Sequence, residues 1–149
     1  MRSVEHAYLR QDDDAIQGME IPEAVRRAWR ARWNGDLNVA INAYEKVNPG
    51  DLDPPLADLI AADKALLEVK VHRGPTSQGA VEATTPLAAF VRAYAQCWKG
   101  FWTDRRLARQ ALWRMTRRAI RMKCRQALVM CAFLLCHLNV LEGRRPLCQ

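Results

Sequence analysis

The segment from Asp104 to Leu141 reads DRRLARQALWRMTRRAIRMKCRQALVMCAFLLCHLNVL and contains neither proline nor glycine. Between residues 104 and 125, apolar side chains recur on one arc of about 100°, at the period of about 3.6 residues that defines an α-helix. These side chains are Ala108, Ala111, Leu112, Met115, Ala119 and Met122. Residues 127–136 are apolar on every side, which is typical of a buried helix. We therefore predict one long basic and apolar C-terminal helix that ends before Gly143.

Proline and glycine place the other helices, because proline favours the first turn and glycine commonly follows the last one. Pro22 and Pro86 stand at predicted starts, and Gly35 and Gly74 follow predicted ends. The predicted helices span residues 23–33, 37–47, 56–72 and 87–98, with a shorter one within 3–17. The pattern predicts a single all-α domain over residues 1–149, a compact bundle of about five or six helices. Within it we expect a helical hairpin region at 22–72, a loop at 76–84 and the C-terminal helices at 86–142.

The composition is that of a globular protein in a reducing compartment. The chain has 149 residues, of which 50% are hydrophobic and 26% charged, enough to bury a core as one domain. Its 5 cysteines form no Cys-x-x-Cys pair, which favours free structural thiols. The first residues lack the apolar segment of a signal peptide, so we expect a cytoplasmic location.

Positive charge is concentrated in the second half of the chain. Residues 1–74 carry 10 Lys or Arg and 13 Asp or Glu, whereas residues 75–149 carry 13 basic and three acidic residues. The second half therefore has a net charge of +10 against −3 for the first. Such an asymmetry indicates a negatively charged partner but says nothing about the fold.

The predicted C-terminal helix carries the candidate binding residues. Five arginines share one arc of about 100° beside the apolar one, and two more project one turn earlier. The five are Arg114, Arg117, Arg118, Arg121 and Arg125, and the two are Arg105 and Arg109. Guanidinium groups grip phosphate or carboxylate with two parallel hydrogen bonds, so this arc predicts contact with nucleic-acid phosphates. An acidic protein surface and a solvated face, partly neutralised by Asp51, Asp53, Asp58 and Asp63, remain alternatives.

Residues 35–47 read GDLNVAINAYEKV, and this stretch resembles the turn and second helix of a tetratricopeptide repeat. In that family a small residue, here Ala40, and an aromatic one, here Tyr44, pack a helical hairpin, and the repeat arrays bind protein segments. The similarity covers residues 22–50, with Ala24 and Ala28 at the family's first-helix Trp and Gly positions, and no second copy follows. An ordinary antiparallel helix pair fits the same residues.

The resemblance and the apolar helix together predict a second function, that of a protein–protein adaptor or assembly subunit. The candidate partner-binding residues are Trp33 and Tyr44 in the hairpin and Phe133 and Leu134 in the apolar helix. The partner would be a second copy or a different chain. The apolar run is shorter than the roughly 20 residues of a membrane span, so a core helix is expected rather than an anchor.

No motif for catalysis is found. The chain lacks a Gly-rich phosphate loop and a GxSxG motif, and its three histidines are not spaced as metal ligands. We therefore expect a non-enzymatic protein without a cofactor or metal.

Overall fold

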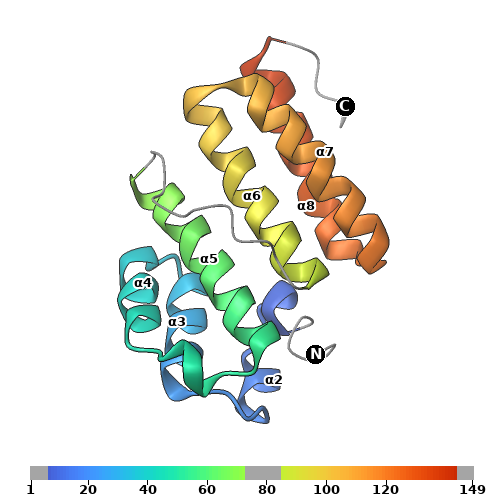
Figure 1. Cartoon of the computed structure of the whole chain (residues 1–149). Helices are drawn as coiled ribbons and strands as arrows, with labels where there is room; N and C mark the ends of the chain where they lie inside the picture. The colour runs from blue at the N-terminus through green and yellow to red at the C-terminus, as the bar shows by residue number, and fades with distance from the viewer. Residues whose placement is uncertain (1–6, 73–84, 144–149) are drawn as a thin grey trace.

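The computed structural model describes residues 7–72 and 85–143, and these residues are helical with no strand (Figure 1). The all-α prediction is confirmed. The helices are α2 (Asp13–Gln17), α3 (Glu23–Trp33), α4 (Leu37–Glu45), the 3-10 helix η1 (Pro49–Asp51), α5 (Pro54–His72), α6 (Pro86–Thr103), α7 (Arg105–Met122) and α8 (Arg125–Leu141). Residues 7–10 add a helical turn, so the expected count of five or six is too low. The loop predicted at 76–84 lies outside the described residues.

Helix ends follow the punctuation seen in the sequence. Thr85 begins α6 by accepting a 3.1 Å hydrogen bond from the backbone N–H of Ala88, and Pro86 occupies the first turn. Asp12 caps α2 in the same way through the N–H of Ala15. Gly35 adopts a φ of +86° after α3, a conformation that favours glycine and turns the chain into α4.

The prediction of one long C-terminal helix is wrong, because the chain folds back at Lys123. Lys123 adopts left-handed φ and ψ values of +51° and +40°, and its N–H bonds to the carbonyls of Ala119 and Ile120. Cys124 is extended and precedes α8. A single straight helix would leave the apolar sides of its two halves far apart. The turn instead lets α7 and α8 bury those sides against each other.

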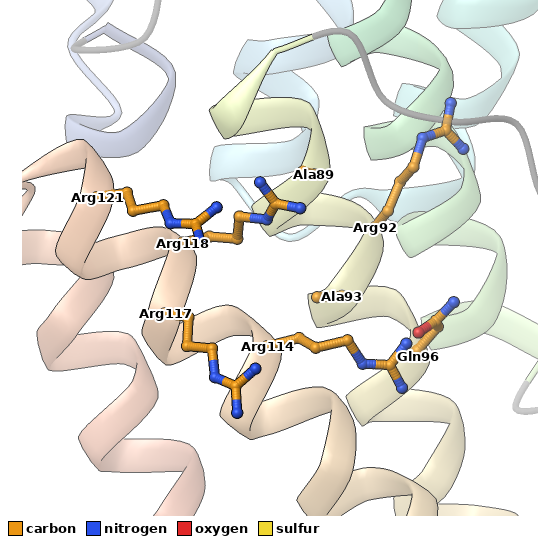
Figure 2. A pocket seen from close by; sticks show the side chains of 8 residues that line it. All are labelled: Ala89, Arg92, Ala93, Gln96, Arg114, Arg117, Arg118 and Arg121. Atoms are coloured by element: carbon orange, nitrogen blue, oxygen red, sulfur yellow. The ribbon is translucent and has the colours of Figure 1, made fainter.

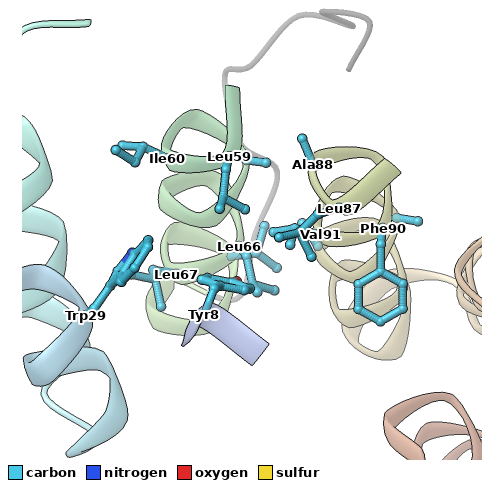
Figure 3. Close-up of a cluster of buried hydrophobic side chains, with 14 of the residues drawn as sticks. Tyr8, Trp29, Leu59, Ile60, Leu66, Leu67, Leu87, Ala88, Phe90 and Val91 are labelled. Atoms are coloured by element: carbon cyan, nitrogen blue, oxygen red, sulfur yellow. The ribbon is translucent and has the colours of Figure 1, made fainter. Parts of the chain in front are cut away.

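Consecutive helices pack against one another along the chain, from α2 to α8. In Figure 1, α3 and α4 lie on one side of α5, and α6, α7 and α8 follow on its other side. Core side chains therefore pack on both sides of α5. Trp29 of α3 lies on one side of this helix, and Phe90 and Val91 of α6 lie on the other (Figure 3). All three side chains are buried.

Because α5 is covered on both sides, one of its charged residues, Asp63, is buried. Among the acids that the solvated-face alternative assigns to neutralising the arginines, Asp63 has no exposed surface. Its Oδ1 accepts hydrogen bonds from the Tyr8 hydroxyl at 2.6 Å and from Arg32 Nε at 2.9 Å. Its Oδ2 accepts a hydrogen bond from the Tyr44 hydroxyl at 2.5 Å. A buried carboxylate with this many donors is satisfied and joins four helical segments.

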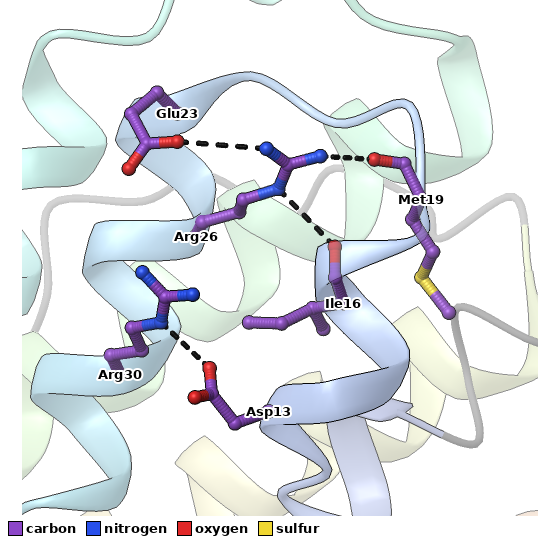
Figure 4. A network of polar contacts seen from close by, with 6 residues as sticks. All are labelled: Asp13, Ile16, Met19, Glu23, Arg26 and Arg30. Atoms are coloured by element: carbon purple, nitrogen blue, oxygen red, sulfur yellow. Dashed lines mark hydrogen bonds and ion pairs between the residues drawn. The ribbon is translucent and has the colours of Figure 1, made fainter.

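A second polar network fastens α2 to α3 (Figure 4). Arg26 of α3 donates hydrogen bonds to the carbonyl of Ile16, in the last turn of α2, and to that of Met19, which follows α2. Arg30 forms an ion pair of 2.6 Å with Asp13 at the other end of α2. These contacts hold a helix of only five residues in place.

Candidate nucleic-acid interface

The site is positioned by an unusually close approach of α6 and α7. A Cβ atom added at Gly100 of α6 would lie 2.5 Å from the backbone nitrogen of Ala108 in α7. The buried side of α7 continues with small residues, Ala111 and Ala119, around Met115. The closeness of the two helices at Gly100 brings the arginines of α7 beside the surface of α6.

Arginines from both helices line a groove of about 280 Å³ between α6 and α7 (Figure 2). Its α6 side consists of two small residues and two long polar ones, and its α7 side consists of four arginines. The lining residues are Ala89, Arg92, Ala93, Gln96, Arg114, Arg117, Arg118 and Arg121. Ala89 and Ala93 leave the space that larger side chains would fill. In Figure 2, Arg114 extends across the groove toward Gln96.

The α7 arginines of this groove form no ion pair with any carboxylate in the described part of the chain. Asp58 pairs with Arg92 at 3.1 Å, and Asp63 is held by Arg32. The segment 105–141 contains nine basic residues and no acidic one. Several guanidinium groups in one groove repel each other, and an anion carrying several charges would relieve that repulsion.

Four of the seven predicted nucleic-acid-binding residues meet in the groove: Arg114, Arg117, Arg118 and Arg121. The other three lie elsewhere. Arg105 donates a hydrogen bond of 2.5 Å to the carbonyl of Leu141, and Arg109 bonds to Asn139 and Glu142. Both arginines thus fasten the start of α7 to the end of α8. Arg125 is exposed at the first position of α8, beyond the turn at Lys123.

Sequence reasoning missed Arg92 and Gln96, because they stand on a different helix from the arginine arc. The signal available was an arginine inside the apolar segment 87–98, with Ala89 three residues before it and Ala93 directly after it. Arg92 is mostly buried through its pair with Asp58, so it also links the groove to α5.

The predicted partner-binding residues divide between core and surface. Tyr44 and Leu134 are buried, so neither is accessible to a partner in this structure. Trp33 is half-buried against Trp29, with ring centroids 6.2 Å apart. Phe133, by contrast, is 77% exposed.

The expectation that the apolar segment is buried on all sides is wrong. Helix α8 buries one side only, and its other side is exposed. We call this exposed side of α8 the apolar face; it comprises Leu128, Val129, Phe133 and Val140. No described helix is long and apolar enough to cross a membrane. The hairpin turn leaves the outer side of α8 without a neighbouring helix in the described chain.

Three described cysteines, Cys97, Cys124 and Cys131, are free thiols as expected. Cys136 is disulfide-bonded, which corrects the expectation of free thiols for this residue. Cys148 lies outside the described residues. Burial raises the pKa of Cys97 to about 12, and the nearby Cys131 adds to the shift.

Outside the groove, one lysine of α5 has a shifted pKa. Lys70 of α5 lies over the rings of Tyr94 and Trp98, 5.0 and 5.2 Å from their centroids. Burial lowers the pKa of Lys70 to about 8, and the Arg32 charge lowers it further. This lysine therefore contributes to packing between α5 and α6 and faces the core side of α6.

Comparison with known protein families, curated proteins and solved structures finds no match. Helices α3 and α4 pack as a pair with Ala40 and Tyr44 buried. Kinship with tetratricopeptide repeats stays a prediction.

Proposed function

We propose that this protein is a non-enzymatic nucleic-acid-binding protein that contacts phosphates through the groove between α6 and α7. The observation that carries the proposal is the convergence of four α7 arginines on one groove without an acidic partner in the described chain. Arginine remains charged at any physiological pH, and its forked donors match phosphate oxygens. A chain of phosphates supplies the repeated negative charge that such a groove requires.

The proposal is tested with the double variant Arg117→Gln/Arg121→Gln and a matched control. Glutamine keeps much of the length and helix propensity of arginine while removing its charge. The control is Arg106→Gln/Arg125→Gln, which removes the same charge from two exposed sites outside the groove. Fluorescence anisotropy with labelled oligonucleotides should show a much greater loss of affinity in the groove variant. Equal affinities for both variants and the parent would contradict the proposal.

A second candidate function is that of an assembly subunit, and the exposed apolar face favours it. Phe133, Val129 and Val140 are 77%, 59% and 56% exposed on α8. Contiguous apolar surface of this kind commonly marks an interface. Sedimentation of the parent and of Phe133→Asp tests whether the face joins a second copy of the chain: the variant should be monomeric if it does.

A further inference from the structure

Trp113 is the most exposed of the five tryptophans, at 60%. Trp29 is buried, and Trp33 and Trp98 are half-buried, so packing accounts for them. The core contact at this level of α7 is made by Leu112, which is 4% exposed. A large aromatic ring left in water is unfavourable, because burial of such a ring is strongly stabilising. Its placement therefore calls for a ligand that the ring can contact.

Two arginines of α7 lie beside the Trp113 ring. Trp113 shares a shallow depression with Gln110, Arg114 and Arg117, and the latter two also line the α6–α7 groove. Arg117 stands one helical turn after Trp113 and about 40° around the axis from it. Trp113 also borders the groove between α7 and α8, beside Leu112 and Leu128. An aromatic face thus adjoins the cations that would hold a phosphate backbone.

The shape of the site favours a flexible strand over a duplex. The arginines line a groove between two packed helices, α6 and α7. A duplex is stiff, with a persistence length of about 50 nm, and its bases are stacked inside. A single strand bends into such a groove and offers unstacked bases.

We infer that the ligand is a single-stranded nucleic acid, with Trp113 as a base-stacking platform and Arg114 and Arg117 binding the flanking phosphates. This inference rests on the proposed function. It extends that function, because phosphate contacts alone do not distinguish a single strand from a duplex. Stacking on an aromatic ring is tolerant of sequence, so the site would read strandedness rather than base identity.

The test compares Trp113→Ala, Trp113→Phe and the control Trp102→Ala on three probes. The probes are a labelled oligo-dT, an oligo-U of the same length and a duplex. Trp102 is the other exposed tryptophan, at 48%, and lies at the end of α6 outside the groove. We expect Trp113→Ala to weaken oligo-dT or oligo-U binding by about 5- to 150-fold and to leave duplex binding unchanged. Trp113→Phe should retain most of the affinity, and the strand bound more tightly identifies DNA or RNA.

The outcomes separate the inference from the proposed function. Unchanged single-strand affinity in Trp113→Ala, or tighter binding of the duplex by the parent, overturns the inference. In that case the proposed phosphate binding still holds, provided that Arg117→Gln/Arg121→Gln binds the probes more weakly than the parent. Parent-like binding of every probe by the arginine variant overturns both. A second measurement is independent of affinity: oligo-dT should quench tryptophan emission in the parent and much less in Trp113→Phe, and equal quenching contradicts stacking. Thermal unfolding followed by circular dichroism verifies that each variant is folded.

Discussion

The hydroxyl of Tyr44 lies 2.5 Å from Oδ2 of Asp63 and donates a hydrogen bond to this fully buried carboxylate. The contact joins α4 to α5, and Arg32 and Tyr8 bring α3 and the first helical turn to the same carboxylate. The first helical turn, α3 and α4 thus all contact the one buried carboxylate of α5. Removing one partner of a buried ion pair leaves the other charge without compensation, which is more damaging than losing an exposed pair.

Asp63→Ala should lower the free energy of unfolding by about 3–5 kcal/mol, because the largely buried Arg32 guanidinium loses its counter-charge. Tyr44→Phe removes one hydrogen bond to a charged group and should lower it by about 1.5–3 kcal/mol. Urea unfolding of both variants checks the prediction. Asp36→Ala is the control, since Asp36 is exposed and its side chain makes no capping hydrogen bond. An effect of Asp63→Ala no larger than that of the control would contradict the account.

Gly100→Ala should destabilise the protein by about 1–3 kcal/mol although alanine is the better helix former. The added Cβ would lie 2.5 Å from the backbone nitrogen of Ala108 and 2.7 Å from its Cα, so the two helices must separate. Shortening the side chain at Ala108 would not relieve a clash with backbone. Gly18→Ala is the matched control, because its nearest neighbour would be 3.8 Å away and its φ is −85°. Comparable melting temperatures for Gly100→Ala and the parent would contradict the close approach.

Leu134→Asp and Phe133→Asp should behave oppositely although the two residues are adjacent. Leu134 is 7% exposed and packs in the core, so a charge there should prevent folding. Phe133 is 77% exposed, so Phe133→Asp should keep the parent's circular dichroism spectrum and melting temperature closely. Loss of helical signal in Phe133→Asp would show that α8 is covered on both sides.

The free energy of unfolding should fall at alkaline pH because the Cys97 thiol ionises more readily in the unfolded state. The folded pKa of Cys97 is about 12, raised by burial above an unfolded value near 9.0, so the folded state keeps a proton that the unfolded state releases. The contribution of this thiol is therefore complete below about pH 9 and declines as pH rises toward 12. Cys97→Ala should be less stable than the parent at pH 7, and the difference should shrink at pH 10.5. Urea unfolding at both pH values measures the difference, and a constant one contradicts the prediction.

Local signals in the sequence predicted the helices well where proline, glycine and caps stand at the ends. The predicted range 23–33 coincides with α3, and Thr85-Pro86 begins α6. The break at Lys123 could not be predicted in this way. Neither glycine nor proline stands there, and the left-handed residue, Lys123, joins two helices that pack against each other.

The arginine arc of α7 could be predicted from the sequence, whereas the α6 residues that complete the groove could not. Helical periodicity placed Arg114, Arg117, Arg118 and Arg121 together, because residues three or four apart share a face. Arg92 and Gln96 join them only through the packing of α6 on α7, which involves Gly100. The burial of Asp63 likewise depends on what covers α5 from both sides, and no local pattern reports that.

The most direct test of the central claim is the dependence of oligo-dT affinity on salt concentration in the parent and in Arg117→Gln/Arg121→Gln. Each phosphate contact on a single strand contributes about 0.7 to the slope of log affinity against log salt. The account predicts a steep slope for the parent and a slope smaller by about 1.4 for the double variant, with Arg106→Gln/Arg125→Gln closer to the parent. A parent slope near zero, or the same slope in all three proteins, would contradict phosphate binding in the α6–α7 groove.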